Sequence, residues 1–404
     1  MMKWREAALG EALQVRHGFA FRGEHFQDHG DLIVLTPGNF IDGGGFKPKS
    51  GVEKYYDGVV PAGYLLKMGD VVVAMTEQAQ GLLGSSATIP SNGRYLHNQR
   101  IGLLEISAPE LLDLRFVYHL MNSPAVRDQI QATATGTKVR HTAPERIRAV
   151  KTRLPPLNVQ RTISEILDTL DELIENNRRR VEVLEEMARA IHREWFVHFR
   201  YPGHENATLV DSSLGPIPDD WEVKPLREIA DLSGGSALTK ASYVDSGYVA
   251  FSAAGPDGCL PDFEIEGDGV VLSAVGARCG RTFKATGRWS SIANTIKIVP
   301  RSGVCGPSWL YLATRDPSAW PKRGSAQPFI SINDARAVQI TAPDPATATR
   351  FEGACGSLDR AAERLRSEMA VLAQIRDLIL PRLVTGQIDV SSLDLDALVE
   401  SSVA

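Results

Sequence analysis

Two long stretches of the chain carry apolar residues at alternating spacings of four and three. In the first stretch these positions are Ile163, Leu167, Leu170, Ile174, Val181, Leu184, Ala188, Ile191 and Trp195, and Asn177 occupies the remaining one. This spacing predicts the seam of a coiled coil, and Pro155, Pro156, a capping Asn158 and Pro202 mark where the helix starts and stops. A helix over about Val159 to Phe199 would be roughly 60 Å long.

A second seam follows later in the chain. Its positions are Phe351, Leu358, Ala362, Leu365, Met369, Leu372 and Ile379; Arg376 interrupts it, and Pro381 is expected to end the helix. Because each helix follows a globular segment, burying both seams within one chain requires the helices to run antiparallel, with the domains at opposite ends. The tail LVTGQIDV would then return beside the first domain. Asn177 either fixes the register of the pair or is a tolerated polar residue.

The chain also repeats itself once, with a long period. Four residues near its start, Trp4, Leu9, Glu11 and Gly18, match Trp221, Leu226, Glu228 and Gly235 with constant spacing. Further matches pair GDVVVAM from Gly69 with GDGVVLS from Gly267, NQRIGLLEI from Asn98 with NTIKIVP from Asn294, FVYHLMNSP from Phe116 with WLYLATRDP from Trp309, and GTKVRHTAPERIRAVKTRLPP from Gly136 with GSAQPFISINDARAVQITAPD from Gly324. Two copies with this period exclude a solenoid and favour a pseudo-twofold molecule.

These patterns predict an α+β protein with two pseudo-twofold-related mixed α/β domains separated by two long antiparallel coiled-coil helices. We place the first domain at residues 1–155 and the first helix at 156–201. The second domain follows at 202–345, the second helix at 346–384 and the returning tail at 385–404. A length of 404 residues suits two domains of about 100 to 200 residues each.

Charge is distributed unevenly along the chain. The formal net charge is -5, yet the segment from Gly269 to Arg315 contains no acid. It carries Arg278, Arg281, Lys284, Arg288, Lys297, Arg301 and Arg315. Bases also dominate from Lys138 to Arg153, and the excess acid lies in the first helix and the tail. Net charge therefore does not exclude DNA as a partner, although each basic run alone also suits a solvated surface.

Signatures of targeting and of catalysis are missing from the sequence. No stretch has the length of a signal peptide or membrane span, and Cys259, Cys279, Cys305 and Cys355 form no CxxC pair, which favours a cytoplasmic protein with reduced cysteines. There is no GxxxxGK[ST] loop and no NPPY or DPPF box. His192 and His198 are six apart and do not share a helix face, so no metal site is expected.

The chain resembles the specificity subunits of type I restriction-modification enzymes over essentially its whole length. The segment PPLNVQRTISEILDTLDELIENNRRRVEVLEEMARAI and the following REWFVHF, with Trp195, Phe196 and Phe199, look like the family's central spacer helix. LILPRLVTGQIDV looks like its distal counterpart, and GSAQPFIS is similar to the end of a target-recognition domain. His198, where an acidic residue is common, and ATATRFEGACGSL depart from the family pattern.

The resemblance implies a non-catalytic subunit that reads double-stranded DNA. Each domain would read one half of a bipartite site, and the helices would set the spacer and dock two methyltransferase subunits. Restriction and translocase subunits would join through the complex, and no membrane would be involved. S-adenosylmethionine, ATP and Mg would be bound by partner subunits, and none by this chain.

Candidate DNA contacts lie in loops of the two domains, where side chains at base edges give sequence choice. In the first domain they are Gln78, Gln80, Ser85 and Ser86 in EQAQGLLGSS, and Lys138 and Arg140 in the closing loop. In the second domain they are Arg278, Arg281 and Lys284 in GARCGRTFK, and Gln327 in the closing loop. The nearly uncharged first loop and the basic second loop suggest different half-sites.

Three alternatives remain open. The first alternative is the specificity subunit of a type II-like system with a fused methylase-nuclease partner. The second is a non-specific coiled-coil structural protein. The third is a fused methyltransferase or restriction enzyme. The absent catalytic motifs argue against the last, and the duplicated domains have no purpose in a purely structural protein.

Overall fold

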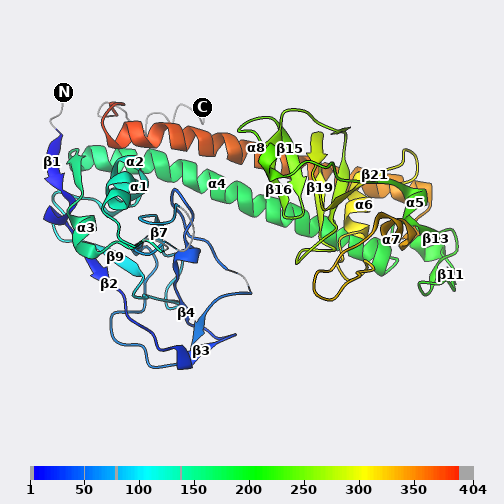
Figure 1. The fold of residues 1–404 in the computed structure, drawn as a ribbon, viewed down its shortest axis with the longest axis horizontal. Helices are drawn as coiled ribbons and strands as arrows, with labels where there is room; N and C mark the ends of the chain where they lie inside the picture. The colour runs from blue at the N-terminus through cyan, green and yellow to red at the C-terminus, as the bar shows by residue number, and fades with distance from the viewer. Residues whose placement is uncertain (1–3, 50, 78–80, 137–138, 391–404) are drawn as a thin grey trace. The chain divides into compact units, whose positions relative to one another are not determined.

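The protein is described by a computed structural model for residues 4–49, 51–77, 81–136 and 139–390. It divides into two compact units (Figure 1). The N-terminal unit comprises Met1–Glu175 and Met369–Ala404, and the C-terminal unit comprises Asn176–Glu368. Each unit therefore contains one globular part and a portion of both long helices.

The N-terminal unit is built on an antiparallel sheet with strand order β2-β9-β6-β7. Its strands are β2 (Leu13–His17), β9 (Ile101–Ile106), β6 (Val71–Ala74) and β7 (Ser86–Thr88). A second sheet has the order β3-β5-β4-β8, formed by β3 (Phe26–Gln27), β5 (Tyr55–Tyr56), β4 (Ile33–Val34) and β8 (Tyr95–Leu96), and β1 (Arg5–Ala8) pairs with β10 (Lys151–Leu154). All four residues of β6 are buried because both of its faces are covered.

Short helices complete the N-terminal unit. They are α1 (Leu114–Asn122), α2 (Pro124–Ala132) and α3 (Pro144–Arg148). Helix α1 begins at Asp113, whose carboxylate accepts hydrogen bonds from the backbone of Arg115 and Phe116 and so satisfies donors that the first turn leaves free. Phe116 on this helix is fully buried and belongs to the main core of the unit.

The C-terminal unit repeats this plan. Its main sheet has the order β14-β21-β18-β19, with β14 (Ala230–Gly234), β21 (Thr295–Pro300), β18 (Gly269–Ser273) and β19 (Thr282–Ala285). The second sheet is β16 (Gly255–Leu260), β15 (Tyr248–Ser252), β20 (Arg288–Ser291) and β17 (Ile265–Glu266), and β13 (Glu222–Pro225) pairs with β22 (Gln339–Ala342). The short helices are α5 (Leu226–Ile229), α6 (Pro307–Ala313) and α7 (Ile332–Ala337), and β11 (Leu209–Val210) pairs with β12 (Ile217–Pro218).

The predicted duplication is confirmed, and the structure corrects its register. Met75 N donates to Arg100 O and Ala274 N donates to Asn294 O, both at 2.9 Å, so Asn294 matches Arg100 and not Asn98. Gly18 and its match Gly235 share a close approach: an added Cβ would lie 2.0 Å and 2.1 Å from the carbonyl oxygens of Asn98 and Ile292. The sequence alignment had paired Asn98 with Asn294 because both are asparagine, but the two residues occupy different positions in their loops.

The long helices are α4 (Leu157–His192), followed by a π-helical turn over Arg193–Val197, and α8 (Pro345–Val384). In the N-terminal unit the seam residues Ile163 and Leu167 pack in one core with Leu380 and Leu383. In the C-terminal unit Val181 packs against Ala362 and Leu365. The order of these contacts is antiparallel within each unit, as the seams predict.

Polar residues in the seam have partners. Asn177 is buried, and its side-chain amide donates to Glu368 Oε2 at 3.3 Å. Arg376, which interrupts the second seam, donates from Nη1 to Asp171 Oδ1 at 3.0 Å. Both contacts link α4 to α8, so the polar positions contribute to pairing.

Two residues that were expected to mark helix ends, Asn158 and Pro381, do not do so. Helix α4 begins before Asn158, which therefore lies inside it, and α8 continues through Pro381 to Val384. Proline removes one backbone hydrogen bond and normally breaks a helix. Here Leu380, Leu383 and Val384 are buried in the core of the N-terminal unit, and their packing holds the last turn.

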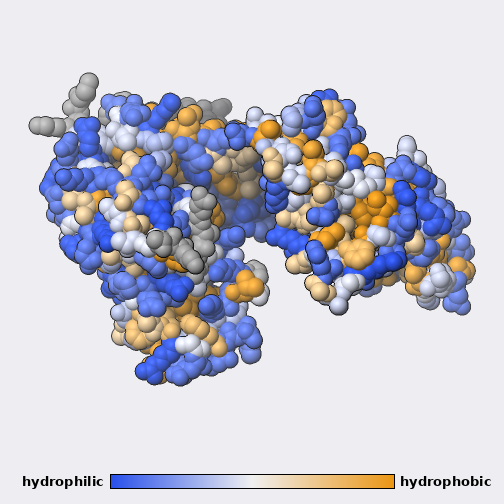
Figure 2. Space-filling model, in the orientation of Figure 1, coloured by the Kyte–Doolittle hydropathy of each residue, from blue (hydrophilic) through white to orange (hydrophobic). Residues whose placement is uncertain are grey.

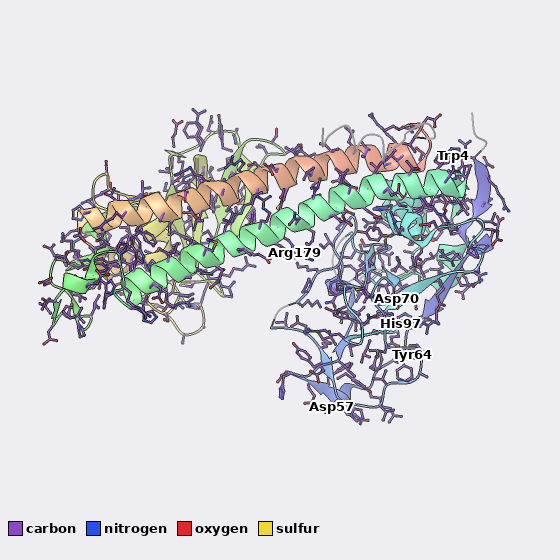
Figure 3. All side chains as sticks on the ribbon, turned by 180° about the vertical axis from the view of Figure 1, so that it is seen from behind. Trp4, Asp57, Tyr64, Asp70, His97 and Arg179 are labelled. Atoms are coloured by element: carbon purple, nitrogen blue, oxygen red, sulfur yellow. The ribbon has the colours of Figure 1, made fainter. Side chains whose placement is uncertain are left out.

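The tail after α8 returns to the globular part of the N-terminal unit. Gly386, with φ of +75°, lies against the Trp4 indole, where an added Cβ would be 2.9 Å from Cε2 (Figure 3). Ile388 packs on the core and Val390 is buried in it. The described beginning and end of the chain are thus neighbours, as predicted. All four cysteines are free.

A carboxylate on the long helix fastens each globular part. In the N-terminal unit Asp168 of α4 accepts hydrogen bonds from Arg115 Nε at 2.8 Å and His119 Nε2 at 2.7 Å, both on α1. In the C-terminal unit Ser308 of α6 contacts Glu352 at 2.8 Å and Asp359 at 2.5 Å on α8. In both units a short helix is bonded to carboxylates of a long helix, but the residues that make the bonds differ.

Candidate nucleic-acid interface

In each unit the structure brings together the two loops that hold the predicted contacts. In the C-terminal unit Gly276 N, in the loop between β18 and β19, donates to Pro328 O of the closing loop at 2.9 Å. In the N-terminal unit Glu77 N, after β6, donates to Arg140 O at 2.9 Å. Isolated bridges at Val275–Phe329 and Thr76–His141 reinforce these contacts. In both units, the loop that follows β6 or β18 and the closing loop therefore lie side by side, at equivalent positions in the fold.

The serine contacts predicted in the N-terminal unit are wrong for this conformation. Ser85 and Ser86 are completely buried. Ser86 N donates to Asn122 Oδ1 at 2.9 Å and its hydroxyl donates to Tyr118 O at 3.0 Å, so this residue joins β7 to α1. A buried hydroxyl with a structural partner does not reach a base edge. Gln78, Gln80 and Lys138 lie outside the described residues.

Arg140 is only partly available. Its guanidinium lies 3.9 Å from Glu77 Oε2 and donates to Gln131 O, and its side chain is 38% exposed. These contacts hold the closing loop against the loop that follows β6. One role of Arg140 is therefore to fix the shape of this edge.

The C-terminal unit presents its predicted loop residues to solvent. Arg278, Arg281 and Gln327 are exposed. Arg278 Nη1 donates to Ala254 O at 2.5 Å, which orients the side chain while leaving other guanidinium donors for a ligand. Among the described residues, no ion pair involves Arg281. These three residues remain candidates for contact with DNA.

Lys284 does not belong with them. It lies on β19 rather than in the loop, and its ammonium forms an ion pair with Asp359 of α8. The side chain of Lys284 is 18% exposed. Successive residues of a strand point to opposite faces of the sheet. A basic side chain two or three residues beyond a loop can therefore point into the unit rather than toward solvent. Its role is to fasten α8.

The basic run of the C-terminal unit is largely neutralised by the fold. Besides Lys284, Arg288 pairs with Glu266 at 2.9 Å, Lys297 with Glu264 at 2.9 Å and Arg301 with Asp231 at 2.8 Å. The partner acids come from outside the acid-free segment. The sequence therefore overstated the free positive charge, which is concentrated on the loop arginines.

In the described part of the chain, no group of three or more His, Cys, Asp or Glu side chains is arranged to hold a metal ion. His192, considered as a ligand in the sequence, packs between Phe196 and Phe351. Burial lowers the pKa of this imidazole to about 4. Helices of the described chain also lack a segment long and apolar enough to cross a bilayer.

Sequence reasoning missed a cationic site in the N-terminal unit. Lys49, Lys54 and Arg100 line one small pocket together with Phe26. Lys49 and Lys54 follow the three consecutive glycines at 43–45, and Arg100 lies far along the chain. The nearest sequence signal is KPKSGVEK, three lysines within eight residues, but nothing local places Arg100 beside them.

Comparisons agree with this architecture. A solved S subunit of a type I restriction-modification system from M. genitalium has a TM-score of 0.59 and 16% identity, and the match covers 95% of this chain and 96% of that one. The chain therefore shares its fold, duplicated α/β units with long helices, with this solved subunit. Residues 1–186 match the family described as type I restriction modification DNA specificity domain. The first 186 residues of the chain are therefore similar to the specificity domain of type I restriction-modification enzymes.

Curated relatives carry the same designation. The type I restriction enzyme EcoBI specificity subunit of Escherichia coli is 27% identical over 179 residues, which cover 44% of this chain and 35% of that protein. The MjaIX specificity subunit of Methanocaldococcus jannaschii is 22% identical over 302 residues, 69% of this chain and 70% of that protein. The chain thus matches about a third of the length of the first relative.

Proposed function

We propose that this chain selects the DNA sequence for a type I restriction-modification complex and performs no chemistry itself. Each unit reads one half of a bipartite double-stranded site. The observation that carries the proposal is one scaffold used twice with different side chains at matched loop positions. Such an arrangement suits an asymmetric two-part target, because each reader changes its contacts without changing its fold.

The long helices set the spacer between the half-sites and dock two methyltransferase subunits. Exposed apolar side chains support the docking role. On α8, Val371, Ile375 and Leu378 are 54%, 42% and 56% exposed and follow a spacing of four and three. On α4, Val183 and Met187 are 59% and 47% exposed. Apolar stripes at this spacing are the surface that another helix buries.

The remaining partners follow from this role. Restriction and translocase subunits join through the complex, and S-adenosylmethionine, ATP and Mg are bound by those partners in the cytoplasm. Changing both long helices by one matched heptad should change the spacer and neither half-site. An unchanged spacer would contradict the role of the helices as a ruler.

The decisive experiment is to co-express the chain with its neighbouring methyltransferase subunit and map methylated adenines in host DNA by long-read sequencing. A strain lacking this chain is the control. A two-part motif with a fixed gap that disappears in the control is expected. A stable complex with an active methyltransferase but no such motif would favour a non-specific structural protein, and a fused methylase-nuclease neighbour would favour the type II-like system.

A further inference from the structure

The N-terminal unit contains a small pocket beside the start of β9. Its volume is about 180 Å³, and its lining includes Lys49, Lys54, Arg100, Thr36 and Phe26. No carboxylate occurs among the described residues that line it. Figure 2 shows polar and apolar residues side by side over β3 and β4, the part of the unit that also holds Asp57 and Tyr64 in Figure 3. Drug-sized ligands occupy roughly 300–1,000 Å³, so this pocket suits one small anionic group.

Lys49 is held in a defined position. Its ammonium donates to Thr36 Oγ1 at 2.6 Å, and Thr36 is in turn bonded to Asn39 Oδ1 at 3.0 Å. Thr36 and Asn39 are both buried. Gly38 leaves the space that the ammonium occupies, since an added Cβ would lie 2.6 Å from Nζ. This charge is fixed before any ligand arrives, which reduces the entropy lost on binding.

The other two cations are placed by different segments. The Lys54 ammonium lies 5.5 Å from the centre of the Phe26 ring, in a cation–π arrangement. The backbone of Arg100 is fixed at the start of β9 by its bond from Met75 N at 2.9 Å and its bond to Asn98 Oδ1 at 3.2 Å. Its side chain remains exposed. Two loops distant in sequence therefore direct positive charge at one point.

The positive charges of Lys49, Lys54 and Arg100 are close together, and burial and mutual repulsion make the charged form of Lys49 less favourable. Burial, followed by repulsion from Lys54, lowers the pKa of Lys49, and the attraction of Glu53 opposes this only in part. An anion in the pocket would relieve both costs, because it supplies hydrogen-bond acceptors and opposite charge to all three groups.

We propose that this pocket binds one backbone phosphate of the DNA duplex held by the N-terminal unit. The inference rests on the proposed function and assigns a site to it. A phosphate contact positions a protein on DNA without reading its sequence. The C-terminal unit lacks this site, because Asn294 occupies the position of Arg100, with Ile292 and Ala293 before it. Its exposed arginines lie on the loop between β18 and β19 instead.

The test uses the full chain with its methyltransferase partner and the variants Lys49→Gln, Arg100→Gln and their combination. Lys67→Gln, an exposed lysine on a turn of the same unit, is the matched control. Dissociation constants are measured across a salt series for a duplex with the mapped site and a scrambled duplex. Each single variant should make the slope of log K against log salt shallower, and the double variant should make it shallower by about 0.9, the value for one phosphate. The ratio between the duplexes should not change.

The outcomes separate the two proposals. Salt slopes equal to that of the control would overturn the phosphate site while leaving specific binding intact. A changed ratio at unchanged slope would make the pocket a base reader instead. Inorganic phosphate or ATP binding to the DNA-free chain, lost in Arg100→Gln without a slope change, would assign it to a soluble phosphate. A wild-type complex that does not distinguish the duplexes would overturn the proposed function itself. If Lys49→Gln does not fold, Arg100→Gln decides alone, because its side chain is exposed.

Discussion

Ser85 and Arg281 occupy the same position in the two units and have opposite environments. Ala74 N donates to Ser85 O at 2.9 Å, and Ser273 N donates to Arg281 O at 2.8 Å, so the two residues make the same backbone hydrogen bond. Yet Ser85 is completely buried and Arg281 is exposed. The scaffold therefore fixes where a loop begins and ends, and the local sequence decides whether that position contributes to the core or to a binding surface.

Positive charge shows the same contrast. The N-terminal unit gathers Lys49, Lys54 and Arg100 beside its second sheet, whereas the C-terminal unit presents Arg278 and Arg281 on a loop of its main sheet. Two copies of one fold have diverged in the location of their free charge. Different half-sites would follow from such a difference without any change in topology.

Exchanging the second domain, residues 202–345, for that of a relative with a different target should have the largest effect. The second half of the recognised motif should change completely and the first half should remain, because each globular part has its own core. Mapping methylated adenines in cells that carry the exchanged chain measures both halves at once. A change in both halves would contradict independent readers.

Replacing Arg281 with Ala should weaken discrimination at one position of the second half-site by about 1–3 kcal/mol, the value of a bidentate contact to guanine. Binding to duplexes with single base-pair changes, measured in the complex, gives this value. Arg288→Ala is the control, since Arg288 is also exposed but pairs with Glu266. An effect confined to the first half-site would reverse the assignment of the two units.

Replacing Asp168 with Asn should lower the free energy of unfolding of the N-terminal unit by about 1–2 kcal/mol near neutral pH, because Arg115 and His119 lose a charged acceptor. Burial alone would raise the pKa of Asp168, but its bonds to His119 and Arg115 outweigh this and lower it. The carboxylate therefore stabilises the fold above its ordinary pKa of about 3.9. This contribution disappears as the pH falls through the lower folded value.

Urea unfolding at several pH values measures this difference. The gap between wild type and Asp168→Asn should be constant from about pH 7 to pH 5 and should close below about pH 4. Glu165→Gln, one turn earlier on the exposed face of α4, is the control and should show neither effect. A gap that persists below about pH 3, where the carboxylate is protonated in the unfolded chain, would mean that the carboxylate is not the stabilising group.

Ser85→Ala should have the smallest effect, within about 0.5 kcal/mol on the free energy of unfolding, because its buried hydroxyl has no hydrogen-bond partner among the described residues. Ser86→Ala should cost about 1 kcal/mol, since it loses its bonds with Tyr118 and Asn122. Neither should alter DNA discrimination. A loss of discrimination in Ser85→Ala at unchanged stability would restore Ser85 as a DNA contact.

The sequence predicted the helical seams, the duplication and the return of the tail because each has a regular signal. Heptad spacing marks which residues of α4 and α8 are buried, and matched glycines such as Gly18 and Gly235 mark close backbone approaches. It predicted that Arg278 and Arg281 lie in a loop because glycines flank them. The same reasoning failed at Ser86 and Lys284, where the residue type suits solvent but the strand directs it inward.

What the sequence by itself determined is the plan of the molecule: two similar α/β parts, two long paired helices and no catalytic motif. Only the tertiary structure decided which charges remain free. Lys297 and Arg301 find acids brought to them by other strands, while Arg100 joins Lys49 and Lys54 from a distant loop. Periodicity is a local property that the chain carries in its order of residues. The pairing of charges depends on contacts between distant segments, which exist only once the sheets have formed.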